Sequence, residues 1–171
     1  MSIKNNFEHV IITSFNVDFG LKSREEILSF EYLNQRFGLF KQFCFPSVLH
    51  QTNQNFKWLV FFDSETPDIL KMEISRLAEW DNFRPVYVKP ARKPGDFWRD
   101  IVKEYISPGF DFLITTNLDN DDSLSKYFVE IVQNNFHEQE FEFLNFPYGY
   151  MLREDGLYLR EFFIQSIYFF N

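Results

Sequence analysis

The segment from Phe110 to Ser123 constrains the fold more than any other part of this sequence. It begins with the apolar residues Phe110, Phe112, Leu113 and Ile114 and ends in the acidic string 118–122, LDNDD. A short apolar run bounded by turn residues is typical of a buried central strand in a parallel sheet, and ligands bind at the carboxyl ends of such strands. Carboxylates this close together repel one another unless a cation lies among them. The segment therefore predicts a divalent metal site at the tip of a strand.

The order of segments along the chain predicts an α/β fold. Apolar runs alternate with stretches in which apolar residues recur every three or four positions, which is the spacing of a helix face. This alternation is typical of a Rossmann-like, mostly parallel central sheet with helices on both faces. Strands are expected at 10–17, 57–63, 84–90 and from 110 to the acidic string. Helices are expected at 33–44, 66–80, 97–106 and after Asp122 or Ser123, either of which would be the N-cap.

After residue 140 the pattern changes to strands alone, which makes the C-terminal part β-rich. Strands are expected at 141–146, 148–152 and 157–163, with Asp155-Gly156 as the turn between the last two. The 171 residues fit one domain, 1–171. The strongly apolar end of the chain either packs into the core or belongs to an element whose partners lie beyond a truncated end.

Composition favours a globule with an aromatic core and disfavours several functions. The chain has 24 Phe and a net charge of −8, without a long basic cluster, which disfavours nucleic-acid binding. Cys44 is the single cysteine, so we expect a buried, inert thiol rather than a disulfide or zinc site. The N-terminus is polar and no apolar window of about 18 residues follows. We therefore expect no signal peptide, no transmembrane segment and a cytoplasmic location.

The acidic string is compatible with other interpretations. It could be a solvated turn that caps a helix. As a calcium loop it has Ser123 and Glu130 at suitable positions, but Leu124 stands where the loop needs glycine. A phosphohydrolase of the haloacid-dehalogenase type also uses two acids and a hydroxyl in this spacing, as in Asp119, Asp121 and Ser123. In that class, however, the motif resembles a first-strand feature, whereas here it follows the fourth expected strand.

Several motifs together resemble one known family. The chain is similar to the family named "putative rhamnosyltransferase", a group with the glycosyltransferase A (GT-A) architecture. The family usually has Arg where Ser14 and Asn117 stand here, and its members are longer. The resemblance covers roughly residues 10 to 125 and rests on Ile12–Asn16, Arg36–Phe40, Phe45–Val48, Gln51–Phe56, Trp58–Asp63 and Leu118–Asp122.

The resemblance implies roles for particular residues. Asp119 and Asp121 would hold Mn²⁺ or Mg²⁺ and, through it, a nucleotide diphosphate. Asp121 counts among the catalytic residues because it would act at the leaving diphosphate. The resemblance places Thr13, Ser14 and Phe15 at the mouth of the nucleotide pocket, Asp63 at the base or ribose, and Arg92, Lys93 and Arg99 near the diphosphate. For Asp63 a helix-flanking acid, and for the three basic residues a solvated loop, are the alternatives.

An inverting transferase also needs a carboxylate base for the acceptor hydroxyl. The late acids Glu154, Asp155 and Glu161 are candidates, although Asp155 also fits a hairpin turn. The resemblance thus implies a glycosyltransferase that moves a sugar, rhamnose in the family's name, from a nucleotide-diphosphate donor to a glycan or lipid-linked acceptor. A lipid-linked acceptor would be compatible with peripheral membrane association. The alternative is a non-catalytic or truncated module that binds a nucleotide sugar without transferring it.

Overall fold

The computed structural model describes residues 6–17, 22–89, 94–138 and 141–161, and for 94–99 the backbone alone. The chain divides into two compact units, Met1–Phe136 and His137–Asn171, which are described separately below. The prediction of a single domain is not tested by this division.

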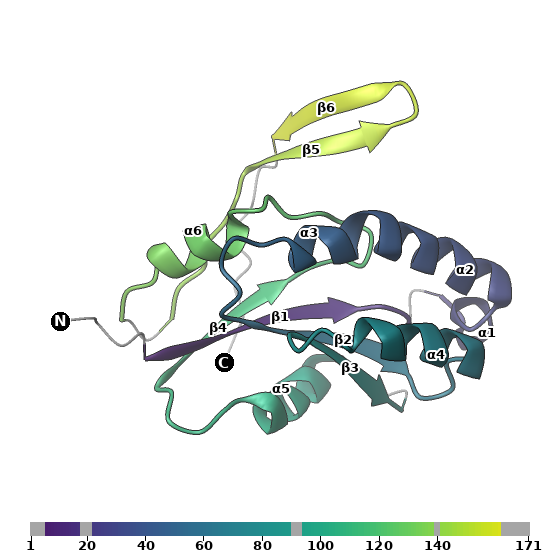
Figure 1. The fold of residues 1–171 in the computed structure, drawn as a ribbon, viewed down its shortest axis with the longest axis horizontal. Helices are drawn as coiled ribbons and strands as arrows, with labels where there is room; N and C mark the ends of the chain where they lie inside the picture. Colours follow the sequence, from purple (N-terminus) through teal and green to yellow (C-terminus); the bar gives the residue numbers. More distant parts are fainter. Residues whose placement is uncertain (1–5, 18–21, 90–93, 139–140, 162–171) are drawn as a thin grey trace. The chain divides into compact units, whose positions relative to one another are not determined.

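A parallel sheet forms the centre of the first unit (Figure 1). Its strands are β1 (Phe7–Ser14), β2 (Lys57–Asp63), β3 (Phe83–Val88) and β4 (Phe112–Asn117). They lie in the order β3-β2-β1-β4, and every neighbouring pair is parallel. The chain therefore moves outward from β1 to β2 and β3 and then returns to the other side of β1. This arrangement confirms the mixed α/β fold and is compatible with a Rossmann-like sheet.

Helices cover both faces of this sheet. The helical elements are α1 (Arg24–Ile27), α2 (Phe30–Leu39), the π-helical segment η1 (Phe40–Cys44), α3 (Phe45–Leu49), α4 (Asp68–Leu77), α5 (Pro94–Tyr105) and α6 (Phe128–Asn134). Figure 1 shows α2 and α3 on one side of the sheet and α5 on the other. Side chains that alternate along β2 separate the two apolar cores: Trp58, Val60 and Phe62 face α2, and Leu59 and Phe61 face α5.

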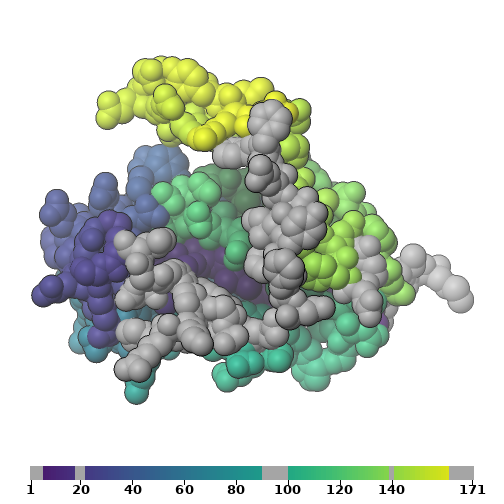
Figure 2. Space-filling model, turned by 180° about the vertical axis from the view of Figure 1, so that it is seen from behind, coloured from purple at the N-terminus to yellow at the C-terminus, as the bar shows by residue number. Residues whose placement is uncertain are grey.

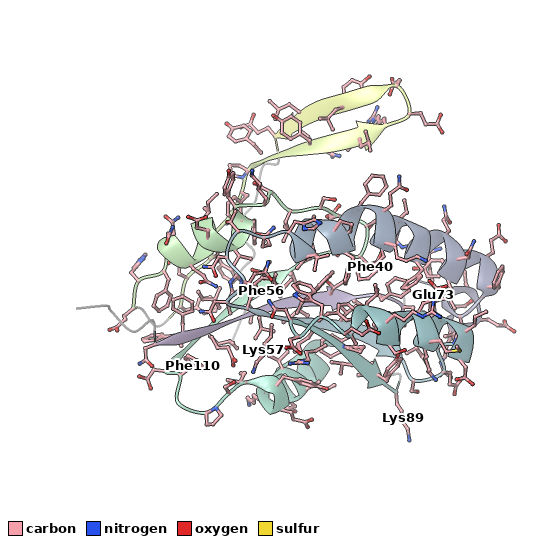
Figure 3. All side chains as sticks on the ribbon, in the orientation of Figure 1. Phe40, Phe56, Lys57, Glu73, Lys89 and Phe110 are labelled. Carbon is pink, nitrogen blue, oxygen red and sulfur yellow. The ribbon has the colours of Figure 1, made fainter. Side chains whose placement is uncertain are left out.

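The larger core is aromatic, as the composition predicts. The expected helix stripe is confirmed, because Leu33, Phe37, Phe40 and Cys44 are all buried. Phe40, labelled in Figure 3, lies between the helical run and the sheet with its ring centroid 5.5 Å from that of Trp58. The run from Phe30 to Leu49 passes through a π-helical turn just before Pro46 and then restarts as α3. A proline cannot donate to the preceding turn, which accounts for a widened turn at this point.

Three expectations about secondary structure were wrong. Strand β4 is not a central buried strand, because within the described residues it pairs with β1 alone and Leu113 is exposed. Helix α6 begins at Phe128, with Tyr127 as its N-cap, so neither Asp122 nor Ser123 caps it. Residues 141–146, where a strand was expected, form no strand.

The second unit contains a β-hairpin. Strands β5 (Tyr148–Arg153) and β6 (Gly156–Glu161) pair antiparallel, and Arg153 faces Gly156 across a turn formed by Glu154 and Asp155. Gly156 has φ +155°, a conformation in which a side chain would be strained. The hairpin's side chains are exposed, and its residues are yellow at the surface in Figure 2. A turn is therefore present where one was predicted, but it is formed by Glu154 and Asp155 rather than by Asp155 and Gly156, which is the first residue of β6.

Across all described residues, no helix is both long enough and apolar enough to cross a bilayer.

Candidate functional site

The candidate site lies where the chain reverses direction across the sheet, at the carboxyl ends of β1 and β4. These strands are neighbours, with Ile12 opposite Asn117 in register. The chain continues from β1 to β2 on one side of it and places β4 on the other, so the direction of the strand order changes between these two strands. In open α/β sheets this reversal opens a crevice in which ligands bind. The acidic string therefore follows β4 at the position where the fold class places ligands.

The buried residue Asn120 attaches the acidic string to the end of β1. Its amide nitrogen Nδ2 donates to the backbone oxygens of Ser14 and Phe15, both at 2.9 Å. Asn120 is 5% exposed, whereas its neighbours Asp119 and Asp121 are exposed. The middle residue of the Asp-Asn-Asp string thus has a structural role, and the two acids on either side of it face solvent.

An arginine from α2, Arg36, forms an ion pair with the last acid of the Asp-Asn-Asp string, Asp121. Arg36 donates from Nη1 to Asp121 Oδ2 and from Nη2 to Asp121 Oδ1, each at 2.9 Å, and Nη2 also contacts Asn120 Oδ1. A guanidinium that binds both oxygens of a carboxylate holds the carboxylate in one orientation and also balances its charge. The remaining nitrogen, Arg36 Nε, is buried and has no hydrogen-bond partner within the described structure.

The loop after the acidic string is held by the end of the long helical run. Ser47 Oγ accepts from the backbone nitrogen of Leu124 at 3.1 Å. Gln51, which is buried, donates to the Ser125 carbonyl at 2.8 Å and accepts from the Val129 nitrogen at 2.9 Å. The Cys44 thiol lies 3.5 Å from the Asp119 carbonyl oxygen. These contacts give the Phe45–Val48 and Gln51–Phe56 motifs a definite task, which is to position the loop that carries the acids.

The acids of the loop influence each other electrostatically. Partial burial, and then the negative charges of Asp119 and Asp121, raise the pKa of Asp122, while Arg36 acts in the opposite direction. Burial raises the pKa of the Cys44 thiol far above its ordinary value, and the same three acids add to this shift. Cys44 is therefore a protonated thiol at neutral pH, as expected for a buried, inert cysteine.

The donor set suits a metal that is shared with a ligand. Within the described residues no three His, Cys, Asp or Glu side chains lie close enough to enclose an ion by themselves. Magnesium-type sites are commonly completed by one or two carboxylates together with substrate phosphates and water. Asp119 is exposed, and its carboxylate has no hydrogen bond or ion pair to another described residue. Asp121 has both oxygens engaged by Arg36, although each oxygen can accept a second contact.

The three predicted residues at the end of β1 differ in accessibility. Thr13 is fully buried, and its hydroxyl accepts from Trp58 Nε1 at 2.9 Å. Phe15 is 2% exposed and packs its ring against Phe37, Phe40 and Phe62. Ser14 is partly exposed, and its backbone oxygen is used by Asn120. Thr13 and Phe15 thus build the floor below the site, and Ser14 is the member of this group with access to solvent.

The predicted acid at the end of β2 is engaged by an arginine. Asp63 is 1% exposed and accepts from Arg24 Nε at 3.2 Å and from Arg24 Nη2 at 3.1 Å. The backbone nitrogen of Glu65 donates to Asp63 Oδ1 at 2.7 Å. The Asp63 carboxylate is therefore already bound by Arg24. A base or ribose at the end of β2 would contact Arg24 as well.

The remaining predicted site residues lie outside the described residues, in α5 or in the second unit. Arg92 and Lys93 lie outside the described residues, and of Arg99 the structure describes only the backbone, within α5. Glu154 and Asp155 form the hairpin turn of the second unit, where Tyr158 donates to Asp155 Oδ2 at 2.9 Å. Glu161 accepts from the Tyr148 hydroxyl at 3.3 Å.

Sequence reasoning missed two residues of this site, Arg36 and Asn120, and the bracing role of Gln51. Arg36 and Gln51 are within the motifs that carry the family resemblance, but a motif does not show which partner a side chain contacts. Asn120 is inside the acidic string, where attention falls on its charged neighbours. An amide between two acids after a strand is the signal that could have identified it.

The comparisons with known proteins bear on this edge of the sheet. The family described as "Putative rhamnosyl transferase" matches the chain over residues 20–160. The chain belongs to this family. Among curated proteins none matches the chain. The match includes Arg36, Gln51 and the acidic string, whereas the end of β1 with Ser14 and Phe15 precedes the matched region. The family's description indicates a glycosyltransferase, a class that requires a sugar donor and an acceptor.

Proposed function

We propose that this rhamnosyl transferase family member has the GT-A arrangement and moves a sugar from a nucleotide-diphosphate donor to an acceptor hydroxyl. The observation that carries the proposal is the pair of exposed carboxylates, Asp119 and Asp121, at the carboxyl end of the strand beside the reversal point. Family membership supports the reaction class. Rhamnose as the sugar, and a glycan or lipid-linked acceptor, follow from the family's name and class and are the finer part of the proposal.

The residues of the site would divide the work between them. Asp119 and Asp121 would hold a divalent ion, Mn²⁺ or Mg²⁺, that stabilises the charge on the leaving diphosphate. Asn120 would keep the two acids at a fixed distance from the β1 end through its bonds to Ser14 and Phe15. Gln51 would prevent the following loop from moving away when the donor enters. Preorganisation of this kind reduces the cost of ordering the site during the reaction.

The predicted candidates for the base that takes the acceptor proton, Glu154 and Asp155, are exposed in the hairpin turn of the second unit. The base therefore stays a prediction. The second candidate function is a module that binds a nucleotide sugar without transferring it. The two functions differ in turnover and share the donor site.

Calorimetric titration with UDP and dTDP tests the donor site. The proposal predicts binding in the presence of Mn²⁺ and its loss with chelator, and it predicts that Asp119→Asn abolishes the metal-dependent part. Asp68→Asn is the matched control, because Asp68 is 99% exposed and far along the chain on α4. Absence of binding by the wild-type chain to both nucleotides, with and without metal, would contradict the proposal.

Release of nucleoside diphosphate from a nucleotide sugar separates the two functions. A transferase releases nucleoside diphosphate slowly even with water as the acceptor, and Asp121→Ala should reduce this release at least a hundredfold if the ion at the leaving group provides a preorganised charge term of the usual size. A binding module takes up the same nucleotide sugar and releases no product.

A further inference from the structure

Arg36 of α2 already supplies a positive charge to the acidic loop, which consists of the acidic string and the residues that follow it up to Ser125. Its guanidinium contacts both oxygens of Asp121 at 2.9 Å and also Asn120 Oδ1. The Arg36 side chain is 23% exposed and that of Asp121 is 39% exposed, so the pair is reachable from solvent. Asp119, Asp121 and Asp122 with one guanidinium leave two negative charges, which a single divalent ion would balance. A metal at Asp121 must share this carboxylate with Arg36 or replace it.

Features of the pair favour replacement. Arg36 Nε is buried without a partner, so the guanidinium bears a desolvation penalty in its present position. The backbone of Arg36 is fixed, because Leu33 and Phe37 of the same helix are buried in the core. A change of side-chain rotamer can therefore move the guanidinium without any change of fold. Asn120 would still be held by Ser14 and Phe15, so the loop keeps its place when Arg36 leaves.

We propose that Arg36 is an internal counter-ion that a divalent metal displaces from Asp121, and that the released guanidinium then binds the diphosphate of the nucleotide. The inference rests on the metal-assisted donor site of the proposed function. A planar guanidinium matches phosphate oxygens as well as it matches a carboxylate, so the same group can serve both states. The exchange gives one residue opposite effects on the two ligands. Arg36 weakens the binding of metal alone and strengthens the binding of nucleotide with metal.

The opposite signs provide the test. Mn²⁺ is titrated into the full chain without nucleotide, and the free ion is followed by electron paramagnetic resonance. Removal of a competing ion pair of this exposure predicts that Arg36→Gln binds Mn²⁺ roughly threefold to tenfold more tightly than the wild type. In a second titration, with saturating Mn²⁺, Arg36→Gln should bind UDP or dTDP at least tenfold more weakly, because it lacks the charge-assisted contact to phosphate.

The matched control is Lys41→Gln on the same helical run. Lys41 forms an ion pair with Glu73 at 2.6 Å, is more exposed than Arg36, and contacts no residue of the acidic loop in the described structure. Lys41→Gln should change neither the affinity for Mn²⁺ nor the affinity for nucleotide by more than about twofold, since an isolated exposed pair contributes little. If Arg36→Gln does not fold, Arg36→Lys provides the same test. It retains the charge without the planar fork, so its manganese affinity should lie between those of wild type and a variant without the pair.

The two titrations distinguish the exchange from the metal site itself. Tighter manganese and weaker nucleotide binding in Arg36→Gln support the exchange. Unchanged or weaker manganese binding in this variant, in a protein whose wild type does bind manganese and nucleotide, overturns the exchange and leaves the proposed function in place. Failure of wild type, Arg36→Gln and Arg36→Lys alike to bind manganese overturns the metal site itself and the exchange with it.

Discussion

His9 illustrates at the residue scale how the interior of the first unit accommodates a titratable side chain. It is 1% exposed, with Nε2 2.9 Å from Thr116 Oγ1 and Nδ1 3.3 Å from Gln133 Nε2. Since the Gln133 amide donates, Nδ1 accepts and the proton of the neutral ring is on Nε2. Burial lowers the pKa of His9 from 6.5 to about 4. The three residues connect β1, β4 and α6 through a neutral imidazole.

The pH dependence of stability should therefore contain a contribution from His9. Because its pKa is lowered in the folded state, the unfolded chain takes up the proton first. The stabilisation is complete above pH 6.5 and is lost as the pH falls toward 4, by on the order of 3 kcal/mol. His9→Gln, which can still hydrogen-bond, should show a smaller loss over this range in urea unfolding at pH 7 and pH 4.5. An equal loss of unfolding free energy between pH 7 and pH 4.5 in both proteins would refute the role of His9.

Asp122 should oppose folding at neutral pH. Its pKa is raised by burial and by Asp119 and Asp121, so its ionised form is disfavoured in the folded state. Asp122→Asn should raise the melting temperature at pH 7.5, by an amount that corresponds to a few tenths of a kcal/mol after solvent screening. The gain should disappear as the pH falls below the raised pKa, because the wild-type carboxyl is then neutral as well. Calorimetric scans with chelator at pH 7.5 and 3.5 provide the check, and a lower melting temperature at pH 7.5 would contradict it.

At the scale of elements, the connection between α3 and α6 determines where the acidic loop lies. Gln51 bonds to Ser47, Ser125 and Val129 and is 4% exposed. Gln51→Leu leaves the buried Val129 nitrogen and the partly buried carbonyls of Ser47 and Ser125 without this partner, which should cost about 2 to 4 kcal/mol in the free energy of unfolding. It should also weaken metal-dependent nucleotide binding in the protein that remains folded. The control is Gln42→Leu on an exposed position of the same helical run, which should do neither.

The elements also show where sequence patterns are sufficient. Periodicity predicted the stripe Leu33 to Cys44 and the strands β2 and β3 closely, because burial on one or both faces imposes those patterns. It failed for β4, since an apolar run does not reveal whether a strand has one neighbour or two. The N-cap rule failed for α6. It favours Asp122 or Ser123, but the helix begins at Phe128, where Gln51 accepts from the nitrogen of the next residue, Val129. The number of neighbours of β4 and the start of α6 both depend on tertiary contacts that the local pattern does not show.

At the scale of the whole molecule, both apolar cores and the acidic loop lie within the first unit. A chain that ends after Glu138 should therefore unfold in one cooperative transition, with a melting temperature within a few degrees of that of the full chain. It should still bind Mn²⁺ and nucleotide, because every residue assigned to the donor site precedes its end. Differential scanning calorimetry and titration measure both properties. A truncated chain without a cooperative transition would show that the second unit is needed for folding.

The sequence alone indicated the family and drew attention to the acidic string, but it did not indicate which side chains contact the acids. The Asp-x-Asp string is recognisable because its spacing and its place after a strand are local features. The pairing of Arg36 with Asp121 spans 85 positions, and that of Arg24 with Asp63 spans 39. Such contacts depend on how helices pack over the sheet, which no local pattern encodes. Thr13 shows the same limit, since its position within the strand pattern did not reveal that its hydroxyl accepts from Trp58 within the core.

The most direct measurement is paramagnetic broadening of backbone amide NMR signals by Mn²⁺ in the presence of UDP or dTDP. The account predicts that the signals of Ser14 and of residues 119–122 lose intensity first, because the ion would lie at the ends of β1 and β4. Asp119→Asn should remove the effect, and the amides of α4 should be unaffected at the same metal concentration. Broadening centred on other acids, or none at all with nucleotide bound, would contradict the account.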